Sequence, residues 1–281
     1  MHQKLLHNFI IDEHVKRSLT EDIGFGDITT DFIYSENDLL TAKLNARSKT
    51  VVCGICVLKR VYACLSDSVH IEVLHQDGDL VDAGDTIAVI SGPARIILTG
   101  ERTALNYMQR MSGIATETRK YQEAIKPYNA SVTDTRKNTP GFRIFEKYAV
   151  MIGGARMHRF NLSDCVMIKD NHIKMAGSIT NAVTTIKKIS SHAHKIEVEC
   201  DTLKQVEEAL SVGCDIIMLD NMSISDMVAA VELIDNRAIV EASGNVKIST
   251  INEIASTGVD VISTSAIVAQ APVIDLGLDI D

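Results

Sequence analysis

Five cationic side chains near the middle of the chain could bind a small, multiply charged anion. They fall into three groups: Arg136–Lys137, His158–Arg159 and Lys169. Between residues 131 and 174 the chain carries eight Lys/Arg and four Asp/Glu, although its formal net charge is −9. A cationic patch in an acidic protein favours a small polyanion, because nucleic acid would favour a broader basic face and a higher pI.

The elements that must position these side chains are apolar strand candidates that alternate with helix candidates after Pro127. The strand candidates are 130–135, 165–168, 195–199, 215–219, 238–241 and 259–263. The helix candidates are 142–151, 178–190, 203–211, 223–233 and 250–256. About six strand–helix units with short connections predict an α/β barrel or an open, doubly wound sheet.

Polar residues follow each strand candidate, and a barrel would gather them around one pocket at the carboxyl ends of its strands. Ser243-Gly244-Asn245 and Ser263-Thr264-Ser265 follow the last two strands, where barrels commonly bind phosphate. The sequence contains no G-x-x-x-x-G-K-[ST] or G-x-G-x-x-G motif, so nucleotide binding by those loops is not supported. The groups at the strand ends are Arg136/Lys137, Lys169/Asp170/Asn171, Glu199, Asp220/Asn221, Ser243/Gly244 and Ser263/Thr264/Ser265.

The first part of the chain has a different pattern, without the regular alternation of strands and helices. Glycines and acidic residues at 21–30 predict a tight turn. Strands are expected at 40–57, 69–75 and 86–91, and helices at 11–19, 58–66, 94–111 and 113–124.

Composition excludes several classes of protein. The chain has 281 residues, of which 46% are hydrophobic and 23% charged, as in soluble globular proteins. No apolar run approaches the roughly 20 residues of a membrane span, and the N-terminus does not read as a signal peptide. The six cysteines are dispersed, which favours a reduced, cytoplasmic protein. Cys53 and Cys56 have redox or zinc spacing, but without a second pair core packing is the better interpretation.

A set of motifs occurs in one order along nearly the whole chain, from about Leu19 to Leu276. The set resembles the quinolinate phosphoribosyltransferase family, also called carboxylating nicotinate-nucleotide pyrophosphorylase. Each motif alone is weak, but the ordered set is highly specific. The motifs are E-D-x-G-x-G-D-x-T, G-E-R-T-A-L-N, S-G-I-A-T, T-R-K-x-T-P-G-x-R, E-K-Y-A-V-x-x-G-G, H-R, I-K-D-N-H, E-V-E, L-D-N and E-A-S-G.

This resemblance implies a fold and a reaction. The fold is an N-terminal α/β sandwich at 1–112, joined by the tail 271–281, and an incomplete TIM-like α/β barrel of six to seven strands at 113–270. The reaction joins quinolinate to phosphoribosyl pyrophosphate with Mg²⁺ and gives nicotinate mononucleotide, pyrophosphate and CO₂. It belongs to NAD biosynthesis. The resemblance implies a homodimer, with a higher oligomer left open, and neither nucleic acid nor a membrane as partner.

The resemblance also assigns roles to residues. Arg102, a surface arginine on sequence grounds, would enter the active site of the partner subunit. Glu199 and Asp220 would lie near the ribose and hold Mg²⁺. Catalytic roles would fall to Lys137, Lys169, Glu199 and Asp220. Substrate would be bound by Arg102, Thr135, Arg136, Lys137, His158, Arg159, Lys169, Glu199, Asp220, Ser243, Gly244, Asn245, Ser263, Thr264 and Ser265.

The chemistry of the implied reaction requires these residue types. Quinolinate carries two adjacent carboxylates, which fixed cations and arginine forks can bind. Loss of pyrophosphate from the ribose builds positive charge, which carboxylates can stabilise, while Mg²⁺ and lysine stabilise the leaving group. No covalent intermediate with the enzyme is required.

Four positions depart from the family pattern: Asn138, Met157, Asn245 and Ser265. Ser265 replaces a glycine, and this would cost free energy if the position required a positive φ. Two alternatives are a related transferase acting on another ring and a catalytically silent protein of the same fold. The retained cations argue against the first alternative. Retained Lys169, Glu199 and Asp220 argue against the second.

Overall fold

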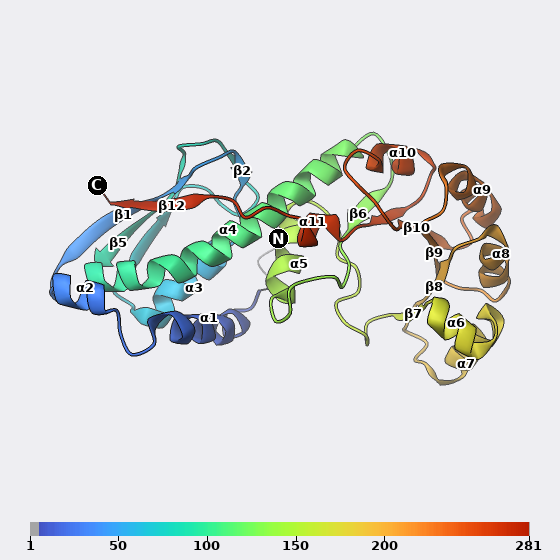
Figure 1. Ribbon diagram of the computed structural model, residues 1–281, viewed down its shortest axis with the longest axis horizontal. Coiled ribbons are helices and arrows are strands. Elements are labelled where there is room, and N and C mark those ends of the chain that lie inside the picture. The colour runs from blue at the N-terminus through green and yellow to red at the C-terminus, as the bar shows by residue number, and fades with distance from the viewer. Residues whose placement is uncertain (1–5, 281) are drawn as a thin grey trace. The chain divides into compact units, whose positions relative to one another are not determined.

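The computed structural model describes residues 6–280, which divide into two compact units. The first unit contains the described residues up to Arg119, together with Thr139–Gly154 and the described residues from Ala271 onward. The second unit contains Lys120–Asn138 and Ala155–Gln270. Each unit is therefore assembled from separate stretches of the chain, as the colours in Figure 1 show.

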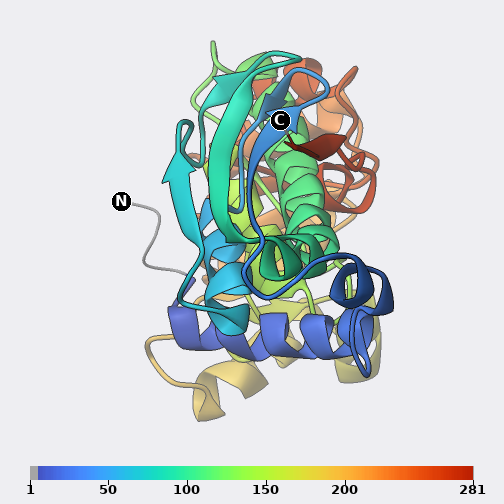
Figure 2. The ribbon, with the colours of Figure 1, turned by 90° about the vertical axis from the view of Figure 1, so that its left-hand side faces the viewer.

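An antiparallel sheet of order β12-β1-β5-β3 forms the strand layer of the first unit, and the long helix α4 runs alongside it (Figure 2). A small pair, β2 and β4, completes its strands in the described part of the chain. This layer of strands and helices is the expected α/β sandwich. Its elements are α1 (Asn8–Ile23), α2 (Ile28–Ile33), β1 (Leu39–Ala46), β2 (Thr50–Val51), α3 (Ile55–Leu65), β3 (His70–Val73), β4 (Leu80–Val81), β5 (Thr86–Pro93), α4 (Ala94–Ala124), α5 (Arg143–Ile152) and β12 (Leu276–Ile280).

The C-terminal segment joins this sheet as β12, which pairs antiparallel with β1 from Ala42↔Ile280 to Ala46↔Leu276. The approach of the tail requires a glycine on α4. A Cβ atom at Gly113 would lie 1.9 Å from the carbonyl oxygen of Pro272, so a larger side chain would displace the tail. The expected association of the tail with the first unit thus takes the form of strand pairing.

Helix α3 begins earlier than its sequence predicts, at Ile55 rather than Leu58. The carboxylate of Asp77 accepts the backbone N–H groups of Gly54 and Ile55, both at 2.9 Å, and so satisfies donors that the start of the helix leaves without partners. The strand expected to reach residue 57 is therefore cut short. Since the capping group comes from a distant loop, the local sequence carries no sign of it.

Cys53 and Cys56 lie at the start of this helix and behave as packing residues. Burial raises the pKa of the Cys53 thiol well above its usual value and that of Cys56 to about 12. Reactive cysteines have lowered thiol pKa values. Both thiols therefore stay protonated at neutral pH, as expected for cysteines that serve core packing.

The second unit is built on six parallel strands, within the described residues, in the order β6-β11-β10-β9-β8-β7. Helices connect successive strands (Figure 1). This confirms the expected α/β architecture. Its elements are β6 (Ser131–Thr133), β7 (Val166–Ile168), α6 (Asp170–Ala176), α7 (Ile179–Ile189), β8 (Ile196–Cys200), α8 (Leu203–Ser211), β9 (Ile216–Asp220), α9 (Ile224–Ile234), β10 (Ile239–Ser243), α10 (Ile251–Ser256), β11 (Val261–Ser263) and α11 (Ala266–Ala269).

The strand order is that of an incomplete barrel. The first strand, β6, pairs with the last, β11, so the sheet curls around rather than extending from β6 to β7. Beyond β6, an isolated parallel bridge joins Thr133 to Arg156, and the N–H of Arg156 donates to the carbonyl of Val132 at 2.9 Å. This bridge is a rudiment of a seventh strand, so the expectation of six to seven strands is confirmed.

Side-chain caps start three of the connecting helices where the sequence predicts them. Ser178 and Ser223 accept the N–H groups of Asn181 and Asp226 at α7 and α9. At α8, Thr202 and Gln205 form a reciprocal capping box. Such caps satisfy backbone groups that the first helical turn leaves without partners. They fix the points at which the chain leaves the sheet.

Three short helices were not among the expected ones: α2 of the first unit, and α6 and α11 of the second. The compact units also divide the chain differently from the expected domains. Helix α4 continues for 31 residues through position 112, where a boundary was expected. Helix α5, expected within the barrel segment 113–270, belongs to the first unit. No helix among residues 6–280 is long and apolar enough to cross a membrane.

Candidate active site

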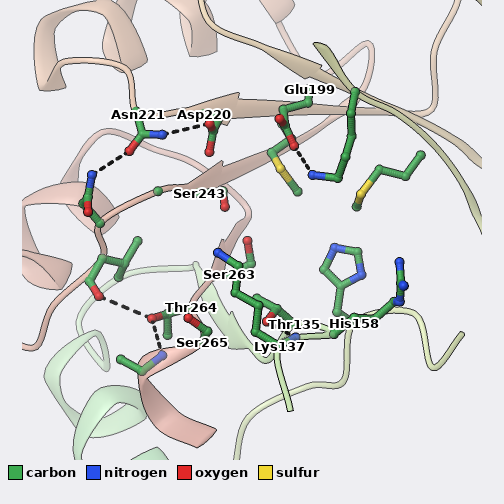
Figure 3. A pocket seen from close by; sticks show the side chains of 18 of the residues that line it. Thr135, Lys137, His158, Glu199, Asp220, Asn221, Ser243, Ser263, Thr264 and Ser265 are labelled. Carbon is green, nitrogen blue, oxygen red and sulfur yellow. Dashed lines mark hydrogen bonds and ion pairs between the residues drawn. The ribbon is translucent and has the colours of Figure 1, made fainter. Parts of the chain in front are cut away.

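A cavity of about 680 Å³ lies at the carboxyl ends of the six parallel strands of the second unit. In Figure 3, Glu199 and Asp220 lie on one side of the hollow, and Thr135, Lys137 and His158 lie on the other. The cavity gathers every expected site residue except Arg102. Its lining includes Thr135, Arg136, Lys137, His158, Arg159, Lys169, Glu199, Asp220, Ser243, Gly244, Asn245, Ser263, Thr264 and Ser265.

The alternation of side chains along each strand explains this convergence. Residues two apart share a face of the sheet, and Lys169, Glu199 and Asp220 each stand two positions beyond an inward residue. The strand register pairs Glu199 with Met218 on β9, and Asp220 with Ser243 on β10. Glu199, Asp220 and Ser243 therefore face the same side of the sheet, toward the interior of the barrel at its carboxyl end.

Lys169 and Glu199 form an ion pair across the ends of β7 and β8. The Glu199 side chain is 14% exposed and that of Lys169 is 43% exposed, so the pair is reachable from the cavity. Lys169 also begins α6, where its backbone N–H donates to Nδ1 of His172 at 3.0 Å. His172 thus orients the start of this helix.

A chain of hydrogen bonds links Asp220 to the loop after β10. Asn221 donates through Nδ2 to Asp220 at 2.8 Å and accepts from the Nδ2 of Asn245, also at 2.8 Å. Both asparagines have positive φ, 53° and 51°, a conformation that asparagine tolerates better than most residues. Gly244 packs against Asn221 and has φ 92°. A Cβ atom at this position would approach Asn221 Oδ1 to 2.3 Å.

The loop after β11 supplies hydroxyl groups to the cavity. The Ser263 hydroxyl is buried and has no hydrogen-bond partner among residues 6–280. Thr264 accepts the N–H of Ala266 at 3.1 Å and orients the turn. Ser265 has φ −80°, so serine fits without backbone strain where the family pattern has glycine. The expected conformational cost at Ser265 is therefore absent.

His158 reaches the cavity from the segment before β7, and its ring nitrogens face protein groups. Its Nε2 lies 3.3 Å from Glu241 and 3.6 Å from Glu197, both buried. Its Nδ1 accepts the N–H of Arg159 at 2.7 Å. Burial lowers the pKa of His158, whereas Glu197 and Glu241 shift it upward. A second ring proton would have to sit on Nδ1, where the Arg159 N–H is donated, so the hydrogen bonds describe the neutral ring.

Arg136, Lys137 and Arg159 supply further positive charge. The Lys137 backbone N–H donates to the Thr135 hydroxyl at 3.0 Å, which shapes the turn after β6. The Arg159 guanidinium donates to the carbonyl of Cys165 at 2.9 Å. Arg102 lies exposed on α4 in the first unit and is not among the residues that line the cavity.

Sequence reasoning missed three charged residues at or below this cavity: Lys247, Glu197 and Glu241. Lys247 lines the cavity, but the loop that carries it gave no cationic signal beyond a single lysine. Glu197 and Glu241 stand two positions before Glu199 and Ser243. Strand alternation would have placed both of them on the interior face.

The fold and the cavity together define the class. An α/β barrel whose strand ends combine several cations, two carboxylates and a set of hydroxyl groups is suited to transfer chemistry on a polyanionic substrate. A silent scaffold would gain nothing from such a concentration of charge in one accessible hollow.

Comparison with known proteins gives the family. Residues 27–112 match the N-terminal domain of the family named quinolinate phosphoribosyl transferase. Residues 114–279 match the C-terminal domain of the same family. The chain is 44% identical over 274 residues to the probable nicotinate-nucleotide pyrophosphorylase [carboxylating] of Synechocystis sp., covering 96% of this chain and 92% of that protein. The corresponding Bacillus subtilis protein is 37% identical, with 99% and 93% covered.

Solved structures of similar proteins support the same family. The nicotinate-nucleotide pyrophosphorylase of Francisella tularensis superposes with a TM-score of 0.92 at 39% identity, covering 98% of both chains. NadC from Streptococcus pyogenes gives a TM-score of 0.95 at 38% identity, covering 98% of this chain and 99% of that one. This chain belongs to the quinolinate phosphoribosyltransferase family, as its ordered motifs indicated. The expected enzyme class, a phosphoribosyltransferase, is confirmed.

Replacement of Gly244 by alanine should destabilise the protein more than replacement of Gly177, a glycine with a similar positive φ. Gly177 has φ 85°, and its nearest neighbour would lie 3.8 Å from a new Cβ atom. Gly177→Ala should therefore cost only the left-handed backbone penalty, about 1–2 kcal/mol. Gly244→Ala should cost about 1–3 kcal/mol more, because it also crowds Asn221.

Chemical denaturation of both variants and the wild type measures this difference. Equal losses in the free energy of unfolding would show that Asn221 moves aside without cost. The hydrogen-bonded link from Asp220 to Asn245 would then not be a rigid part of the cavity.

Proposed function

We propose that this chain transfers the phosphoribosyl group of phosphoribosyl pyrophosphate to quinolinate, with loss of CO₂, in NAD biosynthesis. The products are nicotinate mononucleotide, pyrophosphate and CO₂. Family membership supports the reaction. The observation that carries the residue assignments is the meeting of cations, carboxylates and hydroxyls in one cavity of the second unit.

Quinolinate binds at the cationic part of the cavity. Its two adjacent carboxylates require several fixed positive charges, and Arg136, Lys137 and Arg159 line the hollow close to Lys169. Arginine can bind a carboxylate through two parallel hydrogen bonds, whereas lysine acts as a point charge. The cavity volume of about 680 Å³ leaves room for a second substrate beside the ring.

Phosphoribosyl pyrophosphate binds along the loops after β9, β10 and β11. The 5′-phosphate meets the Ser243–Asn245 loop and the Ser263–Ser265 turn. The buried Ser263 hydroxyl, which has no partner among the described residues, supports this assignment because it can donate to a phosphate oxygen. The ribose then lies near Asp220 and Glu199.

Mg²⁺ fits the carboxylates of Glu199 and Asp220. Mg²⁺ prefers oxygen ligands and usually combines one or two carboxylates with water and substrate phosphates. Asp220 engages Asn221 through one oxygen, Oδ2, and Glu199 remains partly exposed to the cavity beside Lys169. The bound ion would supply charge neutralisation for the pyrophosphate leaving group.

Different side chains stabilise the charges that develop at successive stages of the reaction. As pyrophosphate departs, positive charge builds on the ribose, and the carboxylates of Glu199 and Asp220 stabilise it. Lys137 and Lys169 stabilise the negative charge of the departing group. Decarboxylation then leaves a carbanion-like centre on the ring, which must be protonated, and the fixed cations of the cavity lower the energy of that state.

An assay with quinolinate, phosphoribosyl pyrophosphate and Mg²⁺ tests the reaction. We expect nicotinate mononucleotide to form only when all three are present, and a chelator to stop its formation. Folded protein that gives no product from quinolinate would contradict the proposed substrate. Nicotinate would then be the next ring to test.

Lys137→Ala should reduce kcat/KM by about 10²–10³-fold, because a positioned charge that stabilises the transition state is lost. Folding should change little, since Lys137 is exposed. Lys174→Ala is the matched control, as it removes an exposed lysine on α6 that does not line the cavity. Comparable rates for both variants would remove Lys137 from the proposed machinery.

The site is completed in a homodimer, in which Arg102 of one subunit enters the cavity of the other. Two observations support this part of the proposal. Arg102 is exposed and outside the cavity lining of its own chain. The neighbouring helix α2, which is tied to α4 by hydrogen bonds from Arg95, exposes Phe32 and Ile33. Such an apolar surface is typical of a subunit interface.

Two inactive variants should therefore complement each other. Arg102→Ala and Lys169→Ala homodimers should each be inactive, whereas mixed subunits should recover about a quarter of wild-type activity, because half of random dimers are hybrids with one intact site. Activity of the mixture after confirmed subunit exchange is the measurement. A mixture as inactive as its parts would show that Arg102 does not act across the interface.

The cell compartment is proposed as the cytoplasm. All six cysteines are free thiols, and three of them, Cys53, Cys200 and Cys214, are buried. Free thiols are typical of proteins in reducing compartments.

A further inference from the structure

Two buried carboxylates below the cavity have no part in the reaction proposed above. Glu197 on β8 and Glu241 on β10 have exposed fractions of 0% and 4%. Both oxygens of Glu197 and one oxygen of Glu241 have no hydrogen-bond partner among residues 6–280 that meets full geometry. Burial of poorly paired carboxylates is costly, so their presence requires an explanation.

Both carboxylates face the same atom. Nε2 of His158 lies 3.3 Å from Glu241 Oε1 and 3.6 Å from Glu197 Oε1. The imidazole is itself largely buried, with a side-chain exposure of 10%. The three side chains come from β8, β10 and the segment before β7, so they meet only because the barrel curls around them.

The other ring nitrogen decides where the proton of His158 resides. Nδ1 accepts the backbone N–H of Arg159 at 2.7 Å, and an accepting nitrogen carries no proton. The ring proton is therefore on Nε2, the nitrogen that lies 3.3 Å from Glu241 and 3.6 Å from Glu197. The backbone N–H of His158 donates to the buried carboxylate of Asp134 at 2.8 Å, which fixes the segment from a third side.

The same three groups have the types and spacing of metal ligands, with atoms within 4.8 Å of one another. A metal at Nε2 would need the lone pair there and a proton on Nδ1, normally donated to an acceptor. In this structure Nδ1 accepts the N–H of Arg159, so it cannot also carry the proton that a metal at Nε2 would require. The hydrogen bonds therefore favour a proton on Nε2 over a metal.

We propose that Glu197 and Glu241 are positioning residues that hold His158 in its Nε2–H form, so that Nδ1 fixes the backbone of Arg159 and sets its guanidinium for a substrate carboxylate. At the far end of the Arg159 side chain, the guanidinium donates to the carbonyl of Cys165 at 2.9 Å. His158 thus acts on substrate through Arg159, since both of its ring nitrogens face protein groups. This inference deepens the proposed binding of quinolinate and rests on it.

Substitutions at both glutamates test this role. Glu241→Leu and Glu197→Leu remove the carboxylate, whereas Glu241→Gln and Glu197→Gln keep its shape and an oxygen that accepts from Nε2–H. We expect the leucine variants to raise the KM for quinolinate about tenfold or more, because small displacements of a binding group weaken its effect strongly. The KM for phosphoribosyl pyrophosphate should stay within about twofold, and the glutamine variants should recover most of the loss.

Asp77→Asn is the matched control, because Asp77 is a partly buried carboxylate of the first unit that caps α3. It should lower the free energy of unfolding and leave both KM values unchanged. ¹⁵N NMR of the imidazole gives a readout that a merely structural role would not move. We expect a proton on Nε2 of His158 in the wild type and in the glutamine variants.

Folded variants with an unchanged KM for quinolinate, equal rises in both KM values, or a proton on Nδ1 of His158 in the wild type would overturn the proposal. A divalent metal retained by the wild type in stoichiometric amount and lost from the glutamine variants would also overturn it. If the leucine variants fail to fold, the glutamine variants and the NMR measurement still decide. Failure of wild-type turnover with quinolinate would contradict the proposed function, while the NMR result would still test the state of His158.

Discussion

Parallel pairing of the six strands is the constraint on which the rest of the second unit depends. Each strand carries an apolar stretch that must be buried, and polar residues that line the cavity stand at or just beyond its end. Because the strands run in the same direction and in register, all of these ends meet at one edge. The cavity is therefore a direct result of the sheet, and the segments that follow the strands supply much of its lining.

The sheet also separates charge into layers. Cations dominate one part of the cavity, in a chain of formal charge −9. Glu197 and Glu241 lie beneath them, so the positive charges of Arg159 and its neighbours rest above buried negative charge. Burial and the neighbouring Glu241 raise the pKa of Glu197, whereas His158 and Arg159 oppose that rise, which couples the two layers. The interior of the barrel thus contributes to the electrostatics of the cavity.

Much of the second unit could be predicted from the sequence, for a physical reason. Short apolar stretches that alternate with helix candidates specify parallel strands, and the ends of those strands specify where Lys169, Glu199 and Asp220 lie. The ordered motifs added the family. What local sequence could not show depends on contacts between distant residues. Asp77 starts α3 from another loop, β12 needs its partner β1, and Glu197 meets Glu241 only when the barrel curls.

The route of the chain between the two units has a consequence for how such a protein can change over time. The chain passes from one unit to the other four times, at 119/120, 138/139, 154/155 and 270/271, and the first passage falls within helix α4. Neither unit is one continuous stretch of sequence. A single genetic exchange cannot transfer either unit intact to another protein, so the two must be inherited together and adapt as one.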